Sequence, residues 1–204
     1  MKFRLVFGTI VFIIAFSLCI ALLNFRFYLY NIEFYNDTFN ELRVYELIPR
    51  EVALDQTKNL FAFFKGNTRL DNSFFNEKEL RHLDDVKKLI QLAVFLLYIS
   101  VIAVFILFFI LRKRLKYLFL GTGMLLLAMV LILYLVRFEW LFILFHKISF
   151  TNDLWILNPE TDRLIQLFPI GFFSTFVETV LRNLVISGFF LIGFGSLLKY
   201  FQRN

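Results

Sequence analysis

The residues of this chain best suited to acid–base chemistry are its two histidines, His82 and His146. Imidazole exchanges protons near neutral pH, so two such rings held together could serve as general base and general acid. No nucleophile motif accompanies them, neither a G-x-S-x-G elbow nor a candidate catalytic cysteine. An enzyme built on these histidines would therefore use a nucleophile that arrives with its substrate.

Two carboxylates lie three residues on either side of His82, namely Glu79 and Asp85. Either could fix the tautomer of the imidazole, although Glu79 could equally serve a helix cap and Asp85 could simply be solvated. A non-catalytic role is also open for both histidines, which could be solvated or capping residues in an outer loop. The sequence has no H-E-x-x-H motif and no Cys/His cluster, so we predict neither a metal site nor a cofactor.

The elements that must position these side chains are membrane helices. Hydrophobic residues make up 59% of the chain and aromatic residues 20%, with a mean hydropathy of +0.71, which exceeds what a soluble domain of 204 residues can bury. We predict an all-α, polytopic membrane protein of one domain. Its four transmembrane helices are expected at about 5–23, 89–111, 117–136 and 172–198, with outer segments at about 25–88 and 137–171 forming a small helical extracytoplasmic cap.

The basic residues predict the orientation. Eight Lys and Arg flank the spans on one side without any acidic residue among them, which marks that side as cytoplasmic. Both termini would then be cytoplasmic and both histidines would lie on the extracytoplasmic face. The net charge of +6 is thereby explained by topology, and we do not expect nucleic-acid binding.

The first span could instead be a cleaved signal sequence with a lipobox at Cys19. A lipobox needs a small residue before its cysteine, whereas Leu18 precedes Cys19 and Phe16 stands three positions upstream. We therefore expect an uncleaved helix, with Cys19 as an apolar packing residue.

Two helices are expected in the first outer segment. Residues 50–65 form an amphipathic pattern, with Leu54, Phe61 and Phe64 near one face, and Gly66 ends it. A second helix should begin after Asn76, with Glu79 completing a capping box, and should continue through the second span.

The depth of the two histidines follows from residue counting. His82 stands 30 residues before Arg112, and His146 stands 29 residues after Tyr117. If both helices run on without a break, the imidazoles lie at matched height, roughly 10 to 15 Å beyond the hydrophobic core, at the level of lipid headgroups. The competing interpretation is a re-entrant or interfacial segment in the apolar stretch that follows Arg137.

The fourth span carries charges in its outer half. Glu178 and Arg182 are four residues apart on one predicted helix face, where they could neutralise each other. We weigh a structural ion pair and a role in the site about equally, because ions within a membrane are costly and usually face a polar cavity or a headgroup.

Two sequence blocks are similar to those of the bacterial lipoprotein intramolecular transacylase family. The first is ELRHLDDVK at 79–87; the second is HKISFTNDLW at 146–155, followed by DRLI at 162–165 and Phe168-Pro169. Span number and loop lengths agree over essentially the whole chain.

The resemblance implies a substrate and a reaction. The substrate would be a diacylglyceryl lipoprotein in the bacterial plasma membrane, and the enzyme would move its sn-2 acyl chain to the α-amino group of the N-terminal cysteine, giving the lyso-form. It implies that His82 and His146 are both essential, and that Asn152, Trp155 and Asp162 orient the site, with turn or interface structure as the alternative for these three. Two other functions remain open: a non-enzymatic accessory subunit of the membrane, and a hydrolase that uses the same histidines to activate water.

Overall fold

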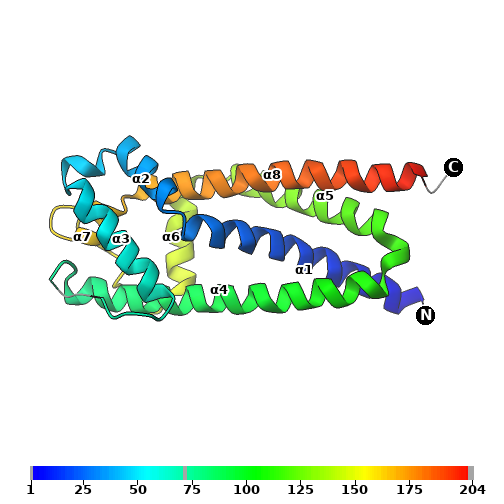
Figure 1. Ribbon diagram of the computed structural model, residues 1–204, viewed down its shortest axis with the longest axis horizontal. Helices are drawn as coiled ribbons and strands as arrows, with labels where there is room; N and C mark the ends of the chain where they lie inside the picture. The colour runs from blue at the N-terminus through cyan, green and yellow to red at the C-terminus, as the bar shows by residue number, and fades with distance from the viewer. Residues whose placement is uncertain (1, 71–72, 202–204) are drawn as a thin grey trace. The chain divides into compact units, whose positions relative to one another are not determined.

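The computed structural model describes residues 2–70 and 73–201. Within these ranges the chain is all-helical, without strands, which confirms the predicted fold class (Figure 1). Four helices are long: α1 (Lys2–Leu29), α4 (Glu77–Ile110), α5 (Leu115–Tyr134) and α8 (Ile170–Phe201). The shorter ones are α2 (Ile32–Glu41), η1 (Val44–Glu46), α3 (Arg50–Phe64), η2 (Arg112–Arg114), α6 (Phe138–Ser149) and α7 (Arg163–Leu167).

The four long helices account for the predicted spans. The segments Phe3–Leu29, Glu77–Ile110, Arg112–Tyr134 and Ile170–Phe201 are each long and apolar enough to cross a membrane. The chain folds into two compact units: α5 lies within unit 1, whereas α1, α4 and α8 each contribute residues to both units.

Unit 1 comprises Met1–Phe25, Val94–Val136 and Thr179–Asn204. Leu118 and Leu126 of α5 lie in its two hydrophobic clusters. Helices α5 and α8 approach closely where glycines face each other, since a Cβ atom on Gly123 would lie 2.6 Å from the Gly188 carbonyl oxygen. An amide pair, Asn183 to Asn24 at 3.1 Å, also joins α8 to α1.

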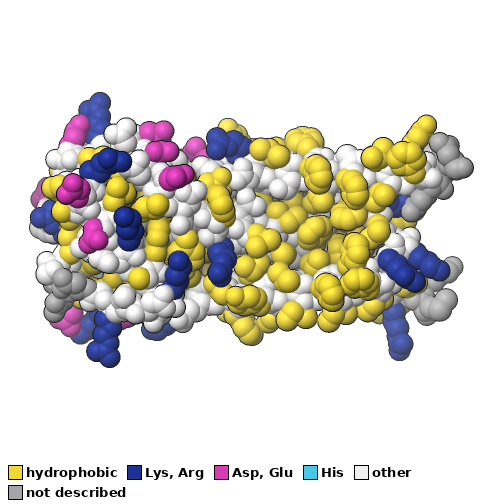
Figure 2. Space-filling view, in the orientation of Figure 1, with side chains coloured by type: hydrophobic (Ala, Val, Ile, Leu, Met, Phe, Trp, Pro, Cys, Tyr) yellow, Lys and Arg dark blue, Asp and Glu magenta, His cyan; other side chains and the backbone are white. Residues whose placement is uncertain are grey.

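Charge divides sharply between the two units. None of the 16 acidic residues of the sequence falls in the ranges of unit 1, which hold nine Lys and Arg. On the face shown in Figure 2, hydrophobic side chains cover the helices of unit 1, and the acidic side chains gather over the elements of unit 2.

Unit 2 comprises Arg26–Ala93 and Arg137–Glu178 and has an aromatic core. Phe39 and Phe75 are fully buried there, and the rings of Tyr35 and Phe172 lie 4.9 Å apart. Tyr35 also donates a hydrogen bond of 3.0 Å to the Leu29 carbonyl.

The local signals read from the sequence hold in α3. The helix ends at Phe64, and Gly66 follows with a φ of +85°, a conformation that costs glycine little. Its buried face is centred on Ala53, Thr57 and Leu60. The predicted Phe61 is also buried, whereas Leu54 and Phe64 lie at the edge of the core.

The condition on which the matched height of the histidines depended, an unbroken third helix as far as His146, is not met. Helix α5 ends at Tyr134, and Arg137 has extended backbone angles (φ −62°, ψ 133°) before α6 begins at Phe138. The apolar stretch after Arg137 forms the separate helix α6, in which His146 is buried and Phe142 contacts Phe173 at 5.5 Å. Its other large apolar side chains are mostly exposed, namely Trp140, Ile143, Phe145 and Ile148. Residue counting along α5 therefore gives no height for His146.

Candidate active site

Helix α4 begins with the predicted capping box. The Asn76 N–H donates to Glu79 Oε2 at 2.7 Å, and the Glu79 N–H donates to Asn76 Oδ1 at 3.0 Å. These reciprocal bonds satisfy two backbone donors that a helix start otherwise leaves without partners. They fix the first turn of the helix that carries His82 one and a half turns later.

The same carboxylate holds a distant segment. The Leu164 N–H donates to Glu79 Oε1 at 2.6 Å, while Asp162 accepts from the Asn76 side chain at 2.9 Å and from the Asn158 N–H at 2.7 Å. We call the set held together by these bonds the Glu79 latch; it consists of Asn76, Glu79, Asn158, Asp162 and Leu164. Glu79 and Asp162 are both buried. Of the open alternatives for Glu79, the structure shows the capping role, and its two oxygens bond to backbone N–H groups rather than to His82.

The two histidines of the sequence lie together in unit 2. The ring centroids of His82 on α4 and His146 on α6 are 6.1 Å apart, with an angle of 30° between the ring planes. Both residues are buried, at 7% and 8% exposure. Sequence reasoning thus predicted the proximity of the rings, but from a straight-helix argument that the break in front of α6 removes.

An aromatic cage encloses the two imidazoles. Phe150 contacts both rings, at 5.0 Å from His82 and 5.6 Å from His146. Phe142, Trp155 and Phe145 lie 4.2, 4.9 and 5.3 Å from the His146 ring. Of these four residues only Trp155 was predicted as a site residue. Phe142 stands one helical turn before His146, and this spacing could have indicated a contact. With 30 phenylalanines in the sequence, such a spacing is not specific.

The hydrogen bonding of His146 defines its tautomer. Its Nδ1 lies 2.7 Å from the Phe142 carbonyl oxygen, and a carbonyl can only accept. Nδ1 therefore carries the hydrogen, and in the neutral ring the lone pair is on Nε2. Burial lowers the pKa of His146 below its ordinary value, against a smaller raising effect of the Phe142 hydrogen bond. The ring is consequently a free base at neutral pH.

His82 is held differently. Its Nδ1 is buried, and within residues 2–70 and 73–201 it has no hydrogen-bond partner. A buried polar atom without a partner is costly and calls for a functional explanation. A polar group of a bound substrate would supply the partner.

A polar edge adjoins the cage. Asp85, one turn after His82 on α4, accepts from the Asn152 side chain at 3.0 Å and from Lys88 Nζ at 2.8 Å. Asn152 also accepts from the Leu154 N–H at 3.1 Å, which shapes the loop that leads to Trp155. Asp85 and Asn152 thus fasten α4 to this loop.

The last two predicted residues form neither a hydrogen bond nor an ion pair with the two histidines, nor an ion pair with each other, in the ranges that the structure describes. Glu178, at the end of unit 2, is exposed and accepts a hydrogen bond of 3.0 Å from the Ser174 hydroxyl. Arg182 falls in the range of unit 1. In the part of the chain that the structure describes, no group of three or more His, Cys, Asp or Glu side chains is placed to hold a metal ion.

Comparison with known proteins identifies the family of the chain. The family model described as "Lipoprotein intramolecular transacylase Lit" matches residues 4–173. The chain is similar to a solved structure of the membrane-integral lipoprotein intramolecular transacylase Lit from Bacillus cereus, with a TM-score of 0.90 and 20% identity, over 100% of this chain and 99% of that one.

Two solved variants of the Bacillus cereus protein, with a histidine replaced by arginine or by alanine, also match. Each has a TM-score of 0.82 and 20% identity over 99% of this chain, covering 95% and 96% of theirs. No curated protein sequence matches. Because the family model covers most of its length, the chain belongs to the lipoprotein intramolecular transacylase family and is an acyltransferase.

Proposed function

We propose that this enzyme moves the sn-2 acyl chain of a diacylglyceryl lipoprotein to the α-amino group of the N-terminal cysteine, leaving the lyso-form lipoprotein. One observation carries the proposal: two imidazoles lie together in an aromatic cage, with one of them fixed as a base by the Phe142 carbonyl. No protein nucleophile is required, since the amine and the ester belong to the same substrate molecule.

His146 is the base in this scheme. As the amine attacks the ester carbonyl, an N–C bond forms and His146 Nε2 takes the proton that the nitrogen releases. The tetrahedral intermediate then collapses, the C–O bond to glycerol breaks, and the same proton passes to the departing oxygen. Protons balance within one turnover, and the ring returns to its starting form.

His82 stabilises the oxyanion. An imidazole offers at least one N–H in every accessible protonation state, and it can donate to the carbonyl oxygen as negative charge develops there. The distance of 6.1 Å between the ring centroids supports this scheme, in which one reacting carbon would approach both rings.

The aromatic walls favour transfer over hydrolysis. Apolar rings around the histidines exclude water, which would otherwise compete with the amine for the same ester. A hydrolase built on the same pair would need a path for water to the base.

The charge division supports an outward site. The charged residues of unit 1 are all basic. They include the cluster at 112–116, which by the positive-inside rule belongs on the cytoplasmic side. We therefore propose that both termini are cytoplasmic and that unit 2 works at the extracytoplasmic face, where the diacylglyceryl lipoprotein presents its ester.

The test is a double-label experiment with purified enzyme. A lipopeptide with a deuterated sn-2 acyl chain and unlabelled peptide is mixed with one whose peptide is isotope-labelled and whose acyl chains are light. Intramolecular transfer leaves both masses unchanged and moves the acyl fragment to the amine in tandem mass spectrometry. Exchange of label between the two peptides would contradict an intramolecular reaction, and loss of one acyl mass would indicate hydrolysis.

Matched variants test the two roles. His146→Gln removes the base, and we expect a loss of about 10²- to 10⁴-fold. His82→Gln keeps a side-chain N–H donor and should retain more activity than His82→Ala, whose loss we place at about 10²- to 10³-fold. Equal losses for His82→Gln and His82→Ala would contradict the oxyanion role.

A further inference from the structure

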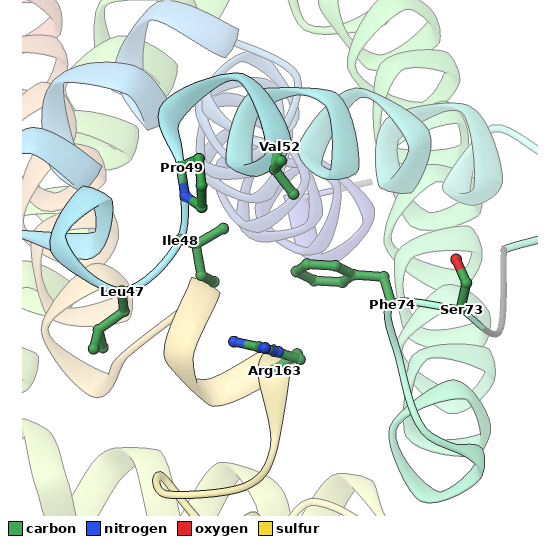
Figure 3. A pocket seen from close by; sticks show the side chains of 7 residues that line it. All are labelled: Leu47, Ile48, Pro49, Val52, Ser73, Phe74 and Arg163. Carbon is green, nitrogen blue, oxygen red and sulfur yellow. The ribbon is translucent and has the colours of Figure 1, made fainter.

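A second candidate site lies in unit 2, apart from the residues of the cage. It is a pocket of about 220 Å³ between the η1–α3 turn, the segment before α4 and the start of α7. Figure 3 shows the seven side chains that line it: Leu47, Ile48, Pro49, Val52, Ser73, Phe74 and Arg163. Five of these are apolar and one is charged.

The charge in the pocket lining belongs to Arg163. Arg163 reaches between Ile48 and Phe74 (Figure 3), and its Nη1 donates to the side-chain oxygen of Gln166 at 3.1 Å. Among the described residues no carboxylate forms an ion pair with it. An apolar pocket whose lining includes a guanidinium is complementary to a ligand that combines an apolar group with an anion.

The volume selects the kind of ligand. The pocket volume of about 220 Å³ lies below the roughly 300 to 1,000 Å³ of pockets that enclose a whole small-molecule ligand. The pocket therefore suits one apolar side chain of a peptide rather than a whole membrane acyl chain. The exposed Leu47 and Val52 at its edge offer further contact to a peptide lying across it.

The distance from the cage is within reach of an extended peptide. Six residues separate Asn76 from His82 along α4, or about 9 Å, and Phe74 stands two residues before Asn76, which adds at most about 7 Å. An extended chain covers such a path with about five residues at roughly 3.3 Å each.

We propose that this pocket binds the peptide of the lipoprotein substrate a few residues after the acylated cysteine, with an apolar side chain among Ile48, Pro49 and Phe74 and an acidic side chain on Arg163. This inference rests on the proposed function, since it takes the lipoprotein as substrate. It adds a specificity site at which the protein part of the substrate is read.

The test is a charge swap measured on full-length enzyme in detergent. Synthetic diacylglyceryl lipopeptides carry an Asp or a Lys at each of the third to seventh positions, and a minimal substrate ends at the second residue. Arg163→Glu should raise KM for an Asp lipopeptide about tenfold with little change in kcat. It should restore a low KM for the matching Lys lipopeptide and leave the minimal substrate unaffected.

Controls separate this inference from the proposed function. Lys58→Glu makes the same change in net charge at an exposed position of α3 outside the pocket lining, and should leave KM unchanged. If Arg163→Glu lowers kcat for every substrate, including the minimal one, or if KM ignores the charge of the peptide, the pocket is not a peptide site. The proposed acyl transfer would stand in either case, because the minimal substrate measures it directly.

Discussion

The peptide N–H of Leu164 donates a hydrogen bond of 2.6 Å to Glu79 Oε1, across 85 positions of sequence. A side chain that caps its own helix thereby also holds the start of α7. The carboxylate is 1% exposed, and both of its oxygens accept from backbone donors.

Glu79→Gln should destabilise the protein. An amide can accept with only one of its two ends, so one backbone N–H would face another donor, at a cost of about 1 to 3 kcal/mol. Thermal unfolding in detergent measures the change. Glu77→Gln is the control, because its carboxylate lies two residues earlier on the surface and pairs with exposed Arg81. Equal shifts in the two variants would contradict a structural role for the Glu79 latch.

The pH dependence of transfer should follow the substrate amine. Burial lowers the pKa of His146, so the base is already free at neutral pH, and the proton that limits the rate is that of the α-ammonium, with a pKa of about 7.7 to 8.0. The rate at low substrate should rise about tenfold per pH unit up to about pH 7 and level off above about pH 8. If titration of His146 limited the rate instead, the rate would already reach its plateau below about pH 6.5.

Initial rates between acidic and mildly alkaline pH check this prediction. A lipopeptide with a less basic amine serves as the comparison, and its profile should shift to lower pH by the difference in amine pKa. A profile that stays in place with both substrates would assign the limiting proton to the enzyme.

Phe150→Ala should admit water to the cage. Its ring contacts both imidazoles, and removing it opens space beside them, where the proposed reaction places the ester. We expect transfer to fall by about a hundredfold through lost positioning and hydrolysed lipopeptide to accumulate. Mass spectrometry distinguishes the two products by the lost acyl mass. Phe150→Leu keeps an apolar side chain there and should yield much less hydrolysis; similar hydrolysis in both variants would show that the ring is not the barrier to water.

Gly123→Ala should destabilise unit 1. The added methyl would lie 2.6 Å from the Gly188 carbonyl oxygen and 3.1 Å from the Ile192 nitrogen, so the backbones of α5 and α8 would have to separate, at about 1 to 3 kcal/mol. Gly193→Ala is the matched control, because a Cβ there meets nothing within 4 Å and alanine favours the helix. A thermal shift of the same sign and size in both would remove the close approach as the cause.

Local chemistry in this chain could be predicted where short-range rules decide it. Asn76 and Glu79 predict the start of α4, and Gly66 predicts the end of α3. Both signals are reliable because capping and left-handed turns depend on a few neighbouring residues. The four apolar helices follow from hydropathy alone. The break at 135–137 contains neither proline nor glycine, and its signal is limited to the charges of Arg137 and Glu139, which interrupt an otherwise apolar run. Hydropathy therefore places the end of the span near 136 without deciding whether the helix continues.

The candidate site could be predicted from the sequence only in part, because most of its contacts are long-range. Histidines are rare in this chain, so His82 and His146 drew attention by their chemistry, and they do lie together. The walls of the cage and the partners of Asp162 depend on a loop folding back over α4, which no local pattern announces. The role proposed for Arg163 likewise depends on the pocket that it lines, which is built from three separate segments of the chain.

The division of charge between the units has a consequence for ionic contacts. The ranges of unit 1 hold nine Lys and Arg but neither an acidic residue nor a histidine, so no salt bridge can form between two side chains of unit 1. Apolar packing and contacts such as the Asn183–Asn24 hydrogen bond hold that unit together instead. The four ion pairs seen among the described residues all belong to unit 2, so added salt, which screens exposed ion pairs, acts on the unit that holds the histidines.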